Sequence, residues 1–282
     1  MPRLLALITV CLLASPAAAQ LLDDPRAMGM GGAVRGDPVG VSALLYNPAG
    51  MARAGVYQAN VAYVRGGASE QNAVTAAVVD SKTQPNFAMG VAYGYHFTDG
   101  EAAQAIDGHD ARLGFATPVV PQKLFLGTAF RYAHINRAKA PDFEAFTLDA
   151  GLLFSPTQTV HLGATAQNLI PTDDPAAPRR VGGGLGITAG VMALDVDVMA
   201  DLDTADSAKP VVNAGLELLL GEALPIRAGY VYDGATERNE VAFGLGFVDN
   251  RPAGGMQVNV GARLDLDDPG IYVVSVGVAA FL

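Results

Sequence analysis

Apolar and polar residues alternate with a period of two along several segments in the second half of the chain. In residues 160–167, Val, Leu and Ala occupy every second position, and His161 and Gln167 are among the residues between them. Such alternation is typical of a β-strand with one face toward an apolar environment and the other toward water. The same alternation of apolar and polar residues recurs at 192–201, 212–218 and 256–264. Because four segments share it, we expect strands in this half of the chain.

The polar faces of these strands carry groups that do not belong among acyl chains. Asp195, Asp197 and Asp201 share one face of an otherwise apolar strand. Because a charged side chain in hydrocarbon is costly, this face is expected to line a polar lumen. A hairpin centred near Glu222 would place Glu217 opposite Arg227 on the same side. The residues assigned to the lumen are His161, Gln167, Asp195, Asp197, Asn213, Glu217, Arg227, Asn259 and Arg263.

Turn-forming residues divide the chain into fourteen candidate strands. They are expected at 56–64, 73–80, 86–97, 109–117, 123–135, 143–154, 159–168, 180–188, 190–201, 210–220, 225–232, 239–248, 256–265 and 271–282. Bacterial single-chain outer-membrane barrels have an even strand number, and a tilted strand crosses with roughly 9 to 11 residues. The sequence therefore predicts an all-β protein, a transmembrane antiparallel β-barrel of about fourteen strands over 56–282.

Composition supports a membrane barrel over a soluble β-sandwich, which would show the same alternation. Half of the residues are hydrophobic and 16% are charged, yet after the first twenty residues no apolar run approaches the length of a membrane helix. Every backbone amide in lipid needs an internal partner, so a closed barrel is the remaining spanning structure. The apolar faces also contain few of the large aromatic residues that fill a soluble core.

The first nineteen residues are typical of a secretory signal peptide. Arg3 supplies the positive charge, 4–13 an apolar stretch, and 17–19 a run of three alanines before the expected cleavage near Ala19. A lipoprotein signal ending at Cys11 is the alternative, which the bulky residue before that cysteine disfavours. Export through a signal peptide and the barrel pattern together predict a bacterial outer-membrane protein.

The last strand has the form of a barrel-assembly signal. Tyr272, alternate residues after it and Leu282 share one face, although Leu282 stands where an aromatic residue is usual. We expect this strand to be recognised by the barrel-assembly machinery and its outward face to contact outer-membrane lipid.

Residues 20–55 are too rich in glycine for one stable helix and alternate too poorly for strands. They contain Arg-Ala-Met-Gly-Met-Gly-Gly-Ala from Arg26, including Met28 and Met30, and Asn-Pro-Ala-Gly from Asn47 and Pro48. In these motifs the chain resembles the long-chain fatty-acid transporter (FadL-like) superfamily, and within it the shorter branch of PorV/PorQ-type proteins. The resemblance implies a fourteen-stranded barrel with residues 20–55 folded into the lumen as a plug. Asn47 is interpreted first as a turn residue and alternatively as a ligand contact.

Candidate chemistry is sparse. None of the four histidines has a serine or acidic partner at a recognisable spacing, and the aspartates at 195–201 and 265–268 lack the spacing of a calcium loop. The net charge of −10 offers no basic surface for nucleic acid. We therefore expect neither an enzyme nor a cofactor, a metal or a nucleic-acid partner.

Two functions fit these observations. The first is a plugged FadL-like channel for uptake or export of small hydrophobic compounds, in which the plug gates an apolar pocket. The alternative is a non-transporting, PorV-like barrel that anchors a secretion, motility or envelope complex through a protein partner.

Overall fold

The computed structural model describes residues 22–67, 70–84, 86–99, 105–251 and 254–282. The expected signal peptide, with Cys11 and the cleavage site near Ala19, lies outside the described residues. So do the first two residues, 20 and 21, of the segment that we expect to form the plug.

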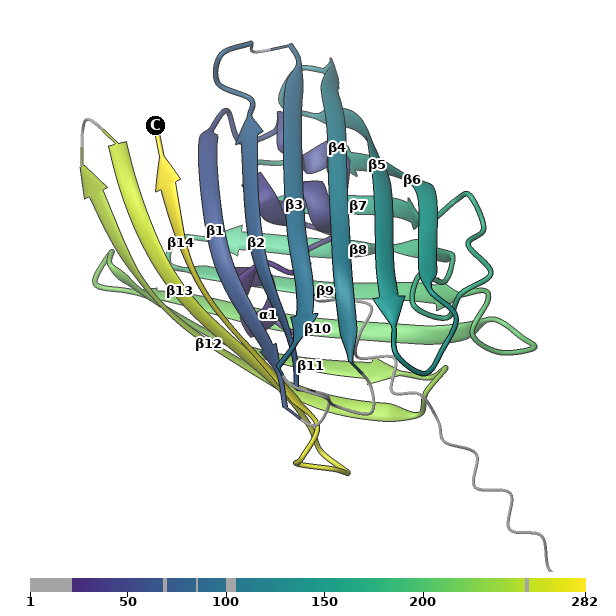
Figure 1. The fold of residues 1–282 in the computed structure, drawn as a ribbon. Coiled ribbons are helices and arrows are strands. Elements are labelled where there is room, and N and C mark those ends of the chain that lie inside the picture. Colours follow the sequence, from purple (N-terminus) through teal and green to yellow (C-terminus); the bar gives the residue numbers. More distant parts are fainter. Residues whose placement is uncertain (1–21, 68–69, 85, 100–104, 252–253) are drawn as a thin grey trace, which may run out of the picture.

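In the described part of the chain, fourteen antiparallel strands form one closed barrel (Figure 1). The strands are β1 (Tyr57–Gly66), β2 (Gln71–Asp80), β3 (Ala88–Thr98), β4 (Ile106–Val120), β5 (Leu124–Arg137), β6 (Phe143–Phe154), β7 (Val160–Gln167), β8 (Arg180–Ala189), β9 (Met192–Asp201), β10 (Lys209–Leu220), β11 (Leu224–Asp233), β12 (Arg238–Arg251), β13 (Gly254–Asp265) and β14 (Tyr272–Phe281). The predicted all-β fold and the strand number are confirmed. The largest departures from the expected bounds are at β4 and β12, which continue to Val120 and Arg251.

Each strand pairs with its neighbours in the chain, and β14 pairs with β1 to close the wall. The pairing between β6 and β7 is short, since it runs only from Ala150↔Ala166 to Phe154↔Leu162. Two ends of the barrel differ in their connections. One, here called the turn end, carries the tight turns at 121–123, 190–191 and 221–223 together with Leu282. The other, the loop end, carries the longer connections at 168–179 and 202–208.

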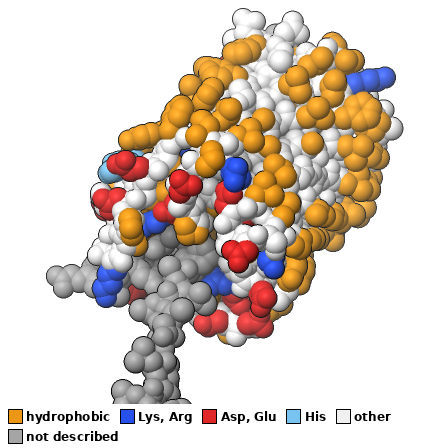
Figure 2. All heavy atoms as spheres, turned by 90° about the vertical axis from the view of Figure 1, so that its right-hand side faces the viewer, with side chains coloured by type: hydrophobic (Ala, Val, Ile, Leu, Met, Phe, Trp, Pro, Cys, Tyr) orange, Lys and Arg blue, Asp and Glu red, His pale blue; other side chains and the backbone are white. Residues whose placement is uncertain are grey.

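The side chains alternate between the lumen and the outer surface, as period-two patterning requires. In β9, Met192, Leu194, Val196 and Val198 are exposed on the outside, whereas Asp195 and Asp197 are buried inside. Figure 2 shows hydrophobic side chains over the barrel wall and charged side chains gathered at one end. An apolar outer wall is what contact with acyl chains demands.

The N-terminal segment, residues 22–53, lies inside the barrel (Figure 1) and consists of two short helices and a 3-10 turn joined by irregular chain. These are α1 (Pro25–Gly29), α2 (Gly40–Tyr46) and η2 (Pro48–Ala52). Asp24 caps α1 by accepting from the Arg26 amide at 3.4 Å, and Asn47 caps η2 by accepting from the Ala49 amide at 3.3 Å. α1 and η2 both begin with proline, which fits a first helical turn because no amide is needed there. Among the described residues, no helix has the length and apolarity to cross a bilayer.

Candidate functional site

Two carboxylates of β9 bind consecutive backbone amides of the N-terminal segment. Asp197 Oδ2 accepts from the amides of Val34 and Arg35 and from Arg35 Nη1, each at 3.1 Å. Asp195 accepts from the amides of Gly36 at 3.2 Å and Asp37 at 2.7 Å. Because alternate residues of a strand share a face, two aspartates two positions apart can meet four successive amides. The irregular stretch 34–37 therefore obtains its hydrogen bonds from the wall rather than from its own backbone.

Glu217 joins the segment to the wall through two arginines. It lies opposite Arg227 in the register of β10 and β11, and Arg227 Nε lies 2.5 Å from its Oε2. Arg26 of α1 donates from Nε and Nη2 to the same carboxylate, at 3.2 and 3.3 Å. Arg227 also donates to Asn259 Oδ1 at 2.9 Å. One carboxylate thus links α1 to two adjacent strands.

Two amide side chains, an arginine and a histidine complete this polar wall. Asn213 donates to the Gly31 carbonyl at 2.6 Å, and Gln167 accepts from Arg35 Nη2 at 3.4 Å. Arg263 Nη2 lies 3.4 Å from Asp23 Oδ2. His161 Nε2 lies 3.4 Å from Arg53 Nη1, and its other ring nitrogen lies 2.9 Å from Ser155 Oγ. The structure therefore places all nine predicted lumen residues on the inner face, in contact with the segment or with one another.

The predicted residues of the N-terminal motifs are also brought to the interior. Met28, Met30 and Asn47 are almost fully buried. Asn47 donates from Nδ2 to the carbonyls of Arg35 at 3.1 Å and Leu152 at 3.3 Å, besides capping η2 before Pro48. These contacts give Asn47 a structural part in docking the segment against β6. The ligand contact considered for Asn47 stays an expectation.

A phenol–carboxyl pair, formed by the partly buried Tyr46 and the buried Asp23, lies within the segment itself. Tyr46 donates its hydroxyl to Asp23 Oδ1 at 2.6 Å. Burial raises the pKa of Tyr46 well above its usual value of 10, and burial also raises the pKa of Asp23 against the opposing charge of Arg263. Tyr46 therefore remains a neutral hydrogen-bond donor at physiological pH.

The wall formed by β3, β4 and β5 contacts the segment in a different way. Leu44 and Met51 pack there against a cluster of small residues that includes Ala92, Ala116 and Ala129. Glycine makes room for them, since a Cβ at Gly114 would lie 2.4 Å from Leu44 Cδ1. The period-two pattern did not predict this apolar inner wall, because alanine and glycine give weak alternation. The signal is present in β3, where Ala88, Gly90, Ala92 and Gly94 alternate with Met89, Val91, Tyr93 and Tyr95.

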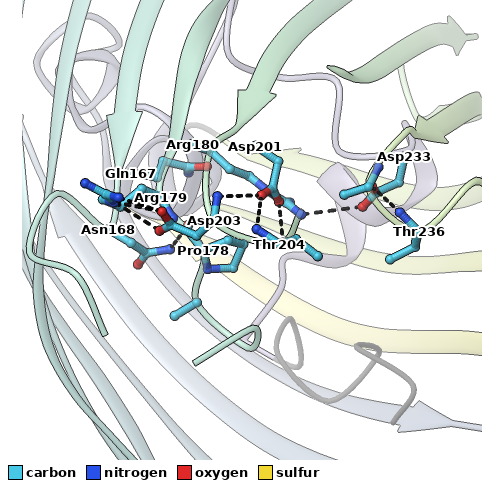
Figure 3. Close-up of polar contacts among 12 residues, drawn as sticks. Gln167, Asn168, Pro178, Arg179, Arg180, Asp201, Asp203, Thr204, Asp233 and Thr236 are labelled. Carbon is cyan, nitrogen blue, oxygen red and sulfur yellow. Dashed lines mark hydrogen bonds and ion pairs between the residues drawn. The ribbon is translucent and has the colours of Figure 1, made fainter. Parts of the chain in front are cut away.

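A cavity of about 180 Å³ opens between the segment and the loop end. Six arginines contribute to its lining, and each of them is paired with a carboxylate. Figure 3 shows part of its rim, where Arg180 bridges Asp201 at 3.0 Å and Asp233 at 3.4 Å. The lining is thus substantially charged, in contrast to the apolar pocket expected from the sequence. In the described residues, no group of three or more His, Cys, Asp or Glu could hold a metal ion.

The two residues of the predicted assembly signal lie on the outer surface. Tyr272 at the start of β14 is 39% exposed, and Leu282 just after it is 63% exposed. Leu282 stays in register at the seam, because its amide donates to the Tyr57 carbonyl at 3.0 Å. The outward face expected for Leu282 therefore agrees with the register in which the barrel closes.

No family model matches the sequence, and no curated protein matches it. Solved structures share its fold. The CymD monoaromatic hydrocarbon channel aligns with a TM-score of 0.63 at 12% identity, covering 91% of this chain and 96% of that one. The toluene transporter TodX of Pseudomonas putida gives 0.61 at 12% identity, over 90% and 96%. A FadL homologue of Pseudomonas aeruginosa gives 0.59 at 11% identity, over 92% and 96%. The chain is therefore similar in fold to these three proteins along almost its whole length, and none of the three is described as a PorV/PorQ-type protein.

Proposed function

We propose that the protein is an outer-membrane channel of the FadL type for small hydrophobic compounds, held closed by its N-terminal segment acting as a plug. The observation that carries this proposal is the segment's attachment to the lumen wall through Asp195 and Asp197, which together bind four consecutive backbone amides. The described barrel closes strand to strand without the segment. The segment can therefore move without opening the wall.

The fold neighbours support the hydrophobic cargo. Two of them are described as a monoaromatic hydrocarbon channel and a toluene transporter, and none of the three as an enzyme. The apolar outer wall and the expected signal peptide support location in the outer membrane. The outward positions of Tyr272 and Leu282 support recognition of the last strand by the barrel-assembly machinery. No contact or neighbour described above favours the docking-barrel alternative, so we do not propose it.

The hydrogen bonds between the segment and β9 can hold a movable plug, because they can be exchanged for hydrogen bonds to water at a small net cost in free energy. When 34–37 leaves Asp195 and Asp197, both the amides and the carboxylates can be hydrated. A continuous path would then run from the loop end past the segment toward the turn end. In this mechanism the strands act as a fixed frame and the segment as the moving part.

Uptake of radiolabelled toluene by cells that display the protein in an intact outer membrane tests the proposal. We expect faster uptake than in cells carrying the empty vector. The variant with both Asp195→Ala and Asp197→Ala should also conduct small ions in planar bilayers, since its plug is released. Asp203→Asn, a change in an exposed loop, is the matched control and should behave as wild type. The proposal would be overturned if cells with normal amounts of folded barrel took up toluene no faster than cells carrying the empty vector.

A further inference from the structure

The connection between β7 and β8, residues 168–179, lies over part of the loop end and is called here the capping loop. The strand β6 begins at Phe143, but its pairing with β7 reaches only Ala150. Beyond that point the capping loop takes the place of β7, because the Leu169 amide donates to the Leu148 carbonyl at 2.8 Å. Part of the loop end is therefore covered by a loop rather than walled by a strand.

The two ends of the capping loop meet at its base. Asn168 donates from Nδ2 to the Pro178 carbonyl at 2.8 Å (Figure 3). Asn168 has a φ of 54°, a left-handed conformation that asparagine adopts more readily than most residues. Between these two residues, Pro171 and Pro175 each fix their own φ angle. A closed base and a proline-restricted interior favour movement of the loop as one body about that base.

The tip of the capping loop is fastened to the barrel by an ion pair. Asp174 accepts from Arg137 Nη1 and Nη2 of β5, at 2.8 and 3.1 Å. The guanidinium of Arg137 also lies over the Phe143 ring, 5.3 Å from its centroid, so it has a second support on the barrel side. The Arg137 and Asp174 side chains are 19% and 18% exposed. Water can therefore replace this contact when the loop lifts, while Arg137 keeps its place on Phe143.

The inner side of the capping loop closes off the interior of the barrel. Ala177 is 2% exposed and belongs to an apolar cluster with Phe143. Ala176 lines both the cavity of about 180 Å³ and a smaller one of about 10 Å³. Because Pro175 and Pro178 also line the larger cavity, withdrawal of the loop would widen that cavity toward the loop end. The capping loop thus lies on the route from the loop end to the N-terminal segment.

We propose that the capping loop is a hinged lid over the loop end, closed by the ion pair between Asp174 and Arg137. A surface loop held by a few polar contacts opens locally while the paired strands stay intact. The lid is a second gate in series with the N-terminal segment, and a compound entering from the loop end meets the lid first. The inference rests on the proposed function for the cargo. Opening of the lid is a property of the protein alone, and it is measured with no cargo present.

Reaction of a buried thiol measures the opening. The one cysteine of the chain, Cys11, lies in the expected signal peptide, so Ala177→Cys gives the mature protein a single thiol. A maleimide reagent reaches this thiol when the loop lifts, and the reaction rate follows the population of the open lid. In the purified protein, adding Asp174→Asn to Ala177→Cys should raise the rate about tenfold, because a bidentate charged contact is lost.

Asp173→Asn is the matched control, because it removes the same charge from the neighbouring exposed residue of the tip. Asparagine also suits the left-handed φ of 53° at this position. Added to Ala177→Cys, it should leave the rate of reaction unchanged. The lid would be contradicted if Asp174→Asn and Asp173→Asn gave the same rate.

Closing the lid covalently tests its place on the transport route. The variant with both Arg137→Cys and Asp174→Cys places one thiol on each side of the ion pair, and a short bifunctional thiol reagent with a reducible link joins them. We expect toluene uptake by cells to fall to the level of the empty vector and to recover on reduction. Asp173→Cys alone, given the same reagent, should keep its uptake. Full uptake with the lid linked would overturn the second gate.

The two experiments separate the lid from the channel. Absence of toluene uptake in untreated wild type would count against the proposed function. Equal thiol reaction in the Asp174→Asn and Asp173→Asn variants would count against the lid, whatever the channel carries. Failure of the lid and failure of the proposed function are therefore distinguishable.

Discussion

The two walls of the lumen hold the N-terminal segment through different interactions, one polar and the other apolar. On β9, the carboxylates of Asp195 and Asp197 bind a stretch of the segment, 34–37, that has no regular secondary structure. On β3, β4 and β5, small residues receive Leu44 and Met51 from α2 and η2. The turns of α2 and η2 pair some of their own backbone groups, as in Asn47 N to Ala43 O and Arg53 N to Gly50 O, whereas 34–37 takes its partners from the wall. The polar groups of β9 thus lie opposite the part of the segment that needs them most.

The largest effect is expected from breaking the polar wall at Asp197. Asp197→Ala removes the acceptor for two amides and leaves the guanidinium of Arg35, which is 4% exposed, without its charge partner. Loss of one member of a buried pair costs about 3–5 kcal/mol in the free energy of unfolding. Hydrogen exchange should show 34–37 unprotected while the strands stay protected. Unchanged protection of 34–37 would mean that the polar wall does not hold the segment.

Leu44→Ala tests the apolar wall. The side chain is fully buried against β3 and β4, and its truncation should lower the free energy of unfolding by about 2–5 kcal/mol. The amides of 34–37 should keep their protection from exchange, because Asp195 and Asp197 are untouched. Chemical denaturation with exchange measured on the same sample separates the two walls. Equal loss of protection at 34–37 would show that they act as one unit.

Gly127→Val tests the close approach of η2 to β5. A Cβ at Gly127 would lie 2.4 Å from the Ala49 amide nitrogen, which belongs to the backbone and cannot turn aside. We expect a loss of about 1–3 kcal/mol as η2 shifts away from β5. Ala164→Val, on the outward face of β7, also enlarges a small residue to valine but does not meet the segment, and it should leave thermal unfolding unchanged. A similar loss in both variants would contradict a specific clash.

The smallest effect is expected outside both walls, at the exposed pair of Arg179 and Asp203. The hydrogen bond from Arg179 lowers the pKa of Asp203, so the pair contributes stability above the unfolded value of about 3.9 and loses it as the pH falls through the lower folded value. Asp203→Asn should cost about 0.2–1 kcal/mol at pH 7 and nothing at a pH below the folded pKa. Urea unfolding at both pH values checks this. A difference that persisted in acid would contradict the assignment.

Local patterns in the sequence were sufficient for the barrel and for the side of the wall on which most residues lie. Period-two alternation is a property of neighbouring residues, and the turn residues that separate the strands act over a few positions. Glu217 and Arg227 could be placed opposite each other because a tight hairpin sets their register. The inner positions of Asp195 and Asp197 followed from the cost of carboxylates in lipid.

Which residue meets which across the lumen was decided only by the closed barrel. Asp197 accepts from Val34 across 163 positions of the chain, and no local pattern encodes that choice. The apolar wall could not be predicted from the sequence, because alanine and glycine contribute little to hydrophobic alternation. Their small size nevertheless makes room for Leu44 and Met51. His96 had no recognisable partner by spacing, and only the fold brings it to the same cavity as Asp110, next to the connection between β7 and β8. Strand and turn propensities are local, whereas the contacts of the segment depend on closure of the whole barrel around it.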